Sequence, residues 1–114
     1  MPVNLGALDV KTLAAQMLAA ALPILKSGAS DAESFAKMEF TKIAQTIVSI
    51  GEQLASGQIN QQQAELLLDM QKSASQNVLL TLKGLALVTV EQAINAALNV
   101  VKTAVNTALG IALL

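Results

Sequence analysis

A run of apolar residues spaced alternately four and three positions apart constrains the fold of this 114-residue chain more than any other feature. The run covers residues 36–54 and consists of Ala36, Phe40, Ile43, Ile47, Ile50 and Leu54. This spacing places the side chains in one seam of an α-helix, suited to knobs-into-holes packing. Neighbouring apolar residues widen the seam, namely Phe35, Met38 and Val48. The polar residues are expected on the remaining surface: Lys37, Glu39, Lys42, Gln45 and Glu52.

A short link after this helix predicts a second helix packed against it. Gly57 is suited to the left-handed conformation that ends a helix. Asn60 and Gln63 have the spacing of a capping box, and Ile59 is placed to pack on the first turn that follows. Helices joined so briefly pack antiparallel. The segments 31–56 and 60–83 are therefore predicted to form an αα-hairpin.

Two further helices are expected, one on each side of this hairpin. The first covers residues 9–26 after an N-terminal arm at 1–8, with Asp9 as its N-cap and Pro23 loosening its last turn. The fourth covers residues 89–113.

Capping patterns and a glycine mark the boundaries of the later helices. Ser30 and Glu33 form a capping box at the start of the second helix, and Thr89 with Gln92 forms a weaker pair at the start of the fourth. Gly84 is expected to separate the third and fourth helices, the alternative being one rod of about 50 residues. Strand patterns are nearly absent, so the prediction is a single all-α domain, an antiparallel bundle of about four helices around the central hairpin.

Aliphatic side chains are more abundant than one small domain needs. Hydrophobic residues make up 54% of the chain and charged residues 13%, with a net charge of -1. Typical soluble domains are about 45 to 50% apolar with Gly included, and about 25% charged. Met17, Met38 and Met70 are expected to fill gaps in the core. The remaining excess requires a partner surface, a lipid phase or a bound apolar ligand.

The excess is concentrated in residues 93–114, where Lys102 is the only charged residue. Polar residues recur there every three or four positions as a stripe, at Asn95, Asn99, Lys102 and Asn106. Four interpretations of the stripe are open. It is the solvent-exposed line on an otherwise buried helix, or a set of polar residues that fixes the register between subunits. Alternatively, it lines the lumen of a pore or a ligand cavity. The apolar residues expected to form a self-association surface are Leu98, Val101, Val105, Leu109, Leu113, Leu13 and Met17.

The residue types that carry most enzymatic and nucleic-acid chemistry are missing. The chain has no His and no Cys, which removes imidazole and thiolate groups. Without Arg, and with two Phe, it also lacks the groups that grip phosphate and stack on bases. Glu65 and Asp69 lie one turn apart and would suit a hard cation, but a solvated stripe that includes Lys72 is the simpler interpretation. No enzymatic activity, cofactor, metal or nucleic-acid partner is predicted.

The leading hypothesis is a non-enzymatic protein with a structural or interaction role that buries its apolar excess by self-association, as a closed homo-oligomer or a filament. One alternative is a membrane- or lipid-active protein that forms pores or binds lipid surfaces through an amphipathic C-terminal helix. A second alternative is a carrier with an apolar ligand cavity between its helices.

Neither end of the chain has a clear membrane signal. A transmembrane span at residues 93–114 is opposed by Lys102 near its middle. The apolar stretch at 13–25 lacks the basic cluster that precedes the core of a signal peptide. A cytoplasmic location is therefore favoured, with membrane association as the alternative.

Overall fold

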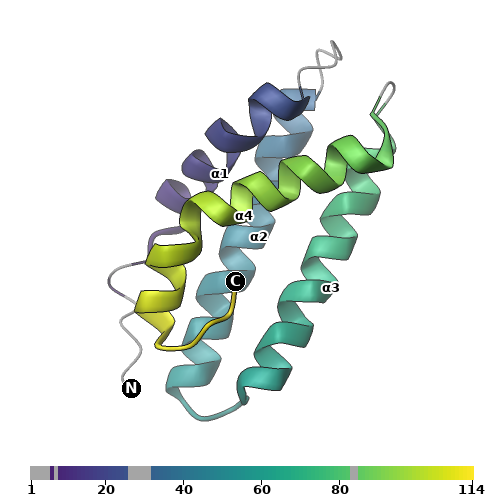
Figure 1. The fold of residues 1–114 in the computed structure, drawn as a ribbon. Helices are drawn as coiled ribbons and strands as arrows, with labels where there is room; N and C mark the ends of the chain where they lie inside the picture. The colour runs from purple at the N-terminus through teal and green to yellow at the C-terminus, as the bar shows by residue number, and fades with distance from the viewer. Residues whose placement is uncertain (1–5, 7, 26–31, 83–84) are drawn as a thin grey trace.

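The computed structural model describes residues 6, 8–25, 32–82 and 85–114, and this part of the chain contains four helices. They are α1 (Val10–Leu25), α2 (Ala32–Ala55), α3 (Gln61–Leu80) and α4 (Leu87–Leu109). The described residues include no strand, so the predicted all-α bundle is confirmed. Consecutive helices run in opposite directions, and the molecule measures 44 × 22 × 17 Å (Figure 1).

The four helices form a ring, in which three neighbouring pairs pack closely and the fourth pair packs loosely. α1 packs extensively against both α2 and α4, and α2 packs extensively against α3. α3 and α4 touch each other only slightly. Figure 1 shows these two helices close together near the 83–84 connection and diverging away from it. A cleft lies on the loose side of the ring, lined by residues of both α3 and α4.

The predicted seam on α2 forms the centre of the core. Its first five residues, from Ala36 to Ile50, are at most 1% exposed, and Leu54 is half-buried against them. α1 packs extensively against α2, and Met17 of α1 and Val101 of α4 belong to the same buried cluster as the seam. Full burial of a large aliphatic or aromatic side chain contributes about 1.5 to 3 kcal/mol. The alternating spacing therefore identified residues at the centre of the buried core.

The link between α2 and α3 has the predicted caps. Gly57 has a φ of 75°, in the left-handed region, and the N–H of Gln58 donates to the carbonyl oxygen of Gln53 at 2.9 Å. This is the longer bond of a Schellman motif. The side chains and backbone N–H groups of Asn60 and Gln63 bond reciprocally, each at 2.9 Å. The predicted αα-hairpin and its capping box are confirmed.

The first helix also begins as predicted. A carboxylate oxygen of Asp9 accepts hydrogen bonds from the backbone N–H of Thr12 at 3.0 Å and from its hydroxyl at 2.7 Å. Pro23 lies inside the last turn of α1, which continues to Leu25. The predicted cap at Ser30 lies outside the described residues.

The third and fourth helices are separate, which confirms the predicted break over the continuous rod, although Gly84 itself lies outside the described residues. α3 ends at Leu80, three residues before the predicted end. The hydroxyl and the backbone N–H of Thr81 both donate to the carbonyl oxygen of Val78, at 2.6 and 3.1 Å. This tighter bonding, from residue i+3 to residue i, is typical of the end of a helix.

Both predicted ends of α4 need correction. The helix begins at Leu87 with no side-chain cap, so the predicted start at Thr89 is wrong. It ends at Leu109 rather than at residue 113, because Gly110 has a φ of 74° and its N–H donates to the carbonyl oxygen of Asn106 at 3.0 Å. A left-handed glycine in this position stops a helix. Residues 110–114 therefore leave the helix axis.

Candidate functional site

The residues predicted to form a self-association surface all lie inside the single chain. None of them is more than 7% exposed, and all belong to the one core cluster. They are Leu98, Val101, Val105, Leu109, Leu113, Leu13 and Met17. The other helices of the same molecule cover them, so the surface open to a partner lies elsewhere.

The predicted polar stripe on α4 divides between two environments. Asn95, Asn99 and Lys102 are exposed, whereas Asn106 is half-buried. The Nδ2 group of Asn106 donates to the carbonyl oxygen of Leu114 at 3.4 Å, and the N–H of Leu114 donates to Oδ1 of Asn106 at 2.9 Å. Asn106 therefore holds the C-terminal residues against α4, while the rest of the stripe is exposed to solvent.

The cleft between α3 and α4 brings the polar stripe of α4 opposite that of α3. Polar side chains from both helices and four leucines line it. They are Glu65, Asp69, Lys72, Asn95 and Asn99, with Leu68, Leu98, Leu113 and Leu114. Within the part of the chain that the structure describes, no group of three or more His, Cys, Asp or Glu residues is placed to hold a metal ion. The pair Glu65 and Asp69 therefore gains no third ligand of these types there.

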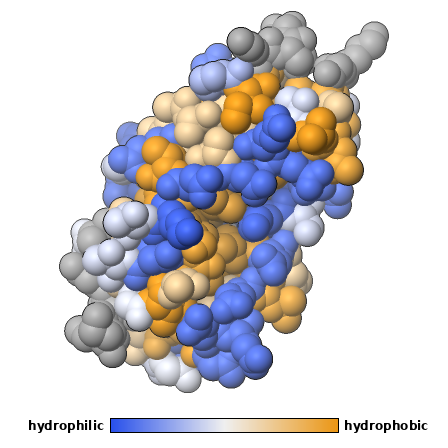
Figure 2. Space-filling view, in the orientation of Figure 1, coloured by the Kyte–Doolittle hydropathy of each residue, from blue (hydrophilic) through white to orange (hydrophobic). Residues whose placement is uncertain are grey.

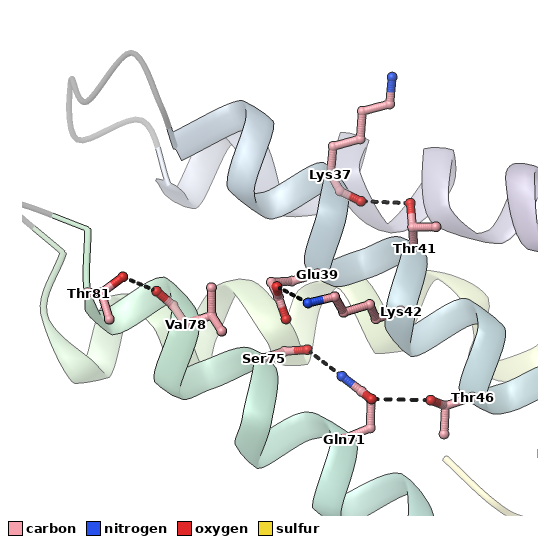
Figure 3. Close-up of polar contacts among 9 residues, drawn as sticks. All are labelled: Lys37, Glu39, Thr41, Lys42, Thr46, Gln71, Ser75, Val78 and Thr81. Carbon is pink, nitrogen blue, oxygen red and sulfur yellow. Dashed lines mark hydrogen bonds and ion pairs between the residues drawn. The ribbon is translucent and has the colours of Figure 1, made fainter.

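A polar bridge that the sequence pattern did not indicate connects α2 to α3 (Figure 3). The hydroxyl of Thr46 donates to Oε1 of Gln71 at 3.4 Å, and Nε2 of Gln71 donates to Oγ of Ser75 at 3.1 Å. Ser75 is fully buried. Gln71 therefore provides a partner for the buried hydroxyl of Ser75 within α3 and also bonds to Thr46 of α2.

Glu39 was expected on the surface of α2, and that prediction is wrong. Its side chain is 1% exposed and forms an ion pair with Lys42 (Figure 3). Glu39 lies seven residues before Thr46, on the side of α2 that meets α3. The packing of α3 on that side buries a position that is polar in the sequence.

Several large apolar side chains remain about half exposed or more. They are Met38, Leu66, Met70, Leu87, Val88 and Val100. The prediction that methionines fill the core is confirmed for Met17, which is fully buried, and wrong for Met38 and Met70. Figure 2 shows hydrophobic surface at the outer edge of α3 beside a hydrophilic band along the same helix. Part of the apolar excess therefore lies on α3.

Two open grooves border α2, and they differ in chemistry. The groove between α2 and α3 has no charged residue in its lining, which consists of Gln45, Thr46, Ser49, Ile50, Gln53, Leu67, Met70, Gln71 and Ala74. The groove between α1 and α2 combines aliphatic residues with charged and polar ones. Its lining is Val10, Ala14, Ala15, Leu18, Ala19 and Leu22, with Asp9, Lys11, Glu33, Lys37 and Thr41.

One carboxyl group at this second groove has a shifted pKa. The hydrogen bonds from the side chain and the backbone N–H of Thr12 lower the pKa of Asp9, because they stabilise its ionised form. Asp9 is exposed, so the shift comes from local bonds at the N-terminus of α1 and not from burial. Its negative charge also interacts favourably with that helix end.

No helix in the described part of the chain is long and apolar enough to cross a membrane. No protein-family model, curated protein or solved structure matches this chain. Its function is therefore inferred from its own surface and interior.

Proposed function

We propose that this chain is a non-enzymatic helical protein with a structural or interaction role, which self-associates into a closed homo-oligomer through the outer face of α3. The observation that carries the proposal is the exposure of Leu66 and Met70, which are 60% and 61% exposed. They lie four residues apart on one helix, so their side chains are neighbours. Large apolar side chains grouped on a surface are typical of a contact with another molecule.

The packing of α3 supports this choice of helix. α3 buries only Ala64, Leu68, Ser75 and Leu79 of its residues, fewer than half as many as α4 buries. α2 covers one side of α3, and α4 touches it only slightly. Much of the circumference of α3 is therefore open to a second molecule.

The charge distribution on α3 supports the same face. Its charged residues, Glu65, Asp69 and Lys72, line the cleft toward α4. The opposite side of α3 borders the uncharged groove with α2, which Met70 helps to line. The centres of protein interfaces are depleted in charge and enriched in Met, whose flexible side chain adapts to a partner.

The size of the face points to a modest interface. The accessible surface of the chain, 6255 Å², is close to the roughly 5,900 Å² expected for a compact monomer of this length. Self-association is therefore not needed to complete the core. A two-fold contact through one helix face and the adjoining groove would bury up to about 800 Å² per partner. We expect a small oligomer, in the simplest case a dimer, that dissociates on dilution.

Light scattering coupled to size-exclusion chromatography, without detergent and over a series of protein concentrations, tests the proposal. The expected result is a mass of at least two chains that falls on dilution. The double substitution Leu66→Gln and Met70→Gln should give a monomer. The matched control Val100→Gln, which removes a similarly exposed apolar side chain from α4, should leave the mass unchanged. A monomer at every concentration, or an oligomer that the double substitution does not affect, contradicts the proposal.

A second candidate function is the binding of an apolar ligand in the groove between α1 and α2. Ala14, Ala15 and Ala19 keep the groove open, and Leu18 and Leu22 supply apolar contact, as in sites for apolar ligands. A saturable titration with a fluorescent fatty acid that Ala19→Glu abolishes would support a carrier. Ala104→Glu, at an exposed position of α4, is the control. Absence of saturable binding contradicts the carrier, and dye release from liposomes would instead support the membrane-active alternative.

A further inference from the structure

We infer that residues 110–114 form a latch, which packs into the cleft between α3 and α4 and opens without unfolding the helical bundle. Figure 1 shows these residues turning back from the end of α4 and running between α4 and α3. The latch is separate from the outer face of α3 and does not depend on self-association.

A glycine hinge begins the latch. Gly110 has a φ of 74°, a conformation that favours glycine over any residue with a side chain. Its N–H donates to the carbonyl oxygen of Asn106, which ends α4 sharply at this point. The following residues therefore leave α4 as a separate segment that reverses direction.

Few interactions hold the latch in place. Both backbone polar groups of Leu114 bond to the side chain of Asn106, at 2.9 and 3.4 Å. Leu113 is 7% exposed, whereas Ala112 is exposed and Ile111 is half-buried. Segments with few buried contacts open locally at a lower free energy than the whole fold. The attachments to break are thus one buried leucine, two partly buried apolar side chains, Ile111 and Leu114, and one asparagine.

The latch connects two helices that scarcely meet. Leu113 and Leu114 line the cleft together with Leu68 of α3 and Leu98 of α4. Leu68 and Leu98 are buried in the closed structure. When the latch is released, Leu113 and Leu114 leave the cleft. Leu68 and Leu98 then become exposed, as an apolar surface between the polar side chains of α3 and those of α4. The latch therefore controls how much apolar surface the chain presents to solvent.

Hydrogen exchange at the Leu114 amide and binding of an apolar fluorescent dye test this inference on the full chain. Asn106→Ala should accelerate exchange at Leu114 by roughly tenfold, as expected for a lost hydrogen bond at the upper end of the usual range, and should increase dye binding. The matched control Asn77→Ala, an exposed asparagine on α3 outside the lining of the cleft, should change neither. Circular dichroism of each variant should show unchanged helix content.

A second substitution separates the latch from the bonds of Asn106. Leu113→Ala keeps the side chain of Asn106 but removes the buried anchor, so it should also increase dye binding at unchanged helix content. If exchange at the Leu114 amide and dye binding are the same in both variants as in the wild type, the latch does not open. Faster exchange across all four helices together would show that it opens only with the bundle. Either result overturns the inference.

Discussion

Glu39 and Lys42 form an ion pair of unequal exposure, in which Oε2 of Glu39 and Nζ of Lys42 are 3.1 Å apart. The side chain of Glu39 is 1% exposed and that of Lys42 is 50% exposed. The lysine thus reaches from solvent to a carboxylate inside the bundle. Because half of the lysine side chain stays in water, the attraction between the two charges contributes less to stability than it would in a fully buried pair. The main role of Lys42 is to provide a partner for the buried carboxylate of Glu39.

Lys42→Ala is expected to lower the free energy of unfolding by about 1 to 3 kcal/mol, because it leaves the buried carboxylate of Glu39 without this partner. Combining Lys42→Ala with Glu39→Met should recover most of the loss, since an apolar side chain of similar size needs no partner there. Urea unfolding followed by circular dichroism measures both variants. Equal loss in the single and the double variant would argue against this explanation.

Phe40→Ala is expected to lower the free energy of unfolding by about 3 to 5 kcal/mol, because the ring is fully buried at the centre of the seam and its removal leaves a cavity. Met38→Ala, on the same helix but 53% exposed, should change it by no more than about 0.5 kcal/mol. The same unfolding measurement compares the two variants. Similar losses at both positions would mean that the seam is not the centre of the core.

Asn60→Ala is expected to destabilise the chain by about 0.5 to 2 kcal/mol, because it removes the side chain that caps α3. Asn77→Ala, an exposed asparagine inside the same helix, is the control and should have little effect. Thermal unfolding reports the difference as a lower midpoint for Asn60→Ala alone. An unchanged midpoint would show that α3 does not depend on its capping box.

The carboxyl group of Asp9 should make stability depend on pH at the acidic end. Its pKa is lower in the folded chain than its ordinary value of 3.8, so its ionised form favours the folded state. The stabilisation is complete well above that value and is lost as the pH falls through the lower folded pKa. Asp9→Asn keeps a capping side chain but removes the titration. The wild type should therefore have the higher unfolding midpoint at neutral pH, and the difference should disappear in acid.

Local patterns were sufficient to predict the centre of this fold. The spacing from Ala36 to Leu54, the glycine at position 57 and the capping box at Asn60 each depend on neighbours within one or two helical turns. These local interactions do not require a distant part of the chain to be folded. The seam, the hairpin and the break between α3 and α4 were accordingly predicted correctly.

The features that were missed depend on packing between distant segments. Glu39 is a polar residue, but the packing of α3 buries it. Leu66 is an apolar residue, but it is exposed because no described helix covers that side of α3. Where residues 110–114 pack depends on how α4 diverges from α3. Leu109 and Leu113 were expected on a self-association surface, but they belong to the core of the chain itself. No pattern within a few residues encodes these outcomes.

The adjacency of the first and last helices has a consequence for how the chain reaches its fold. α1 packs extensively against α4, so these contacts between segments far apart in the sequence cannot form until α4 has been synthesised. The α2–α3 hairpin, in contrast, joins neighbours in sequence and closes a short loop. Since α1 also packs extensively on its neighbour α2, we expect α1, α2 and α3 to pack first, and the side of α1 that meets α4 to stay uncovered until α4 leaves the ribosome. During that interval the uncovered side of α1 needs protection from aggregation.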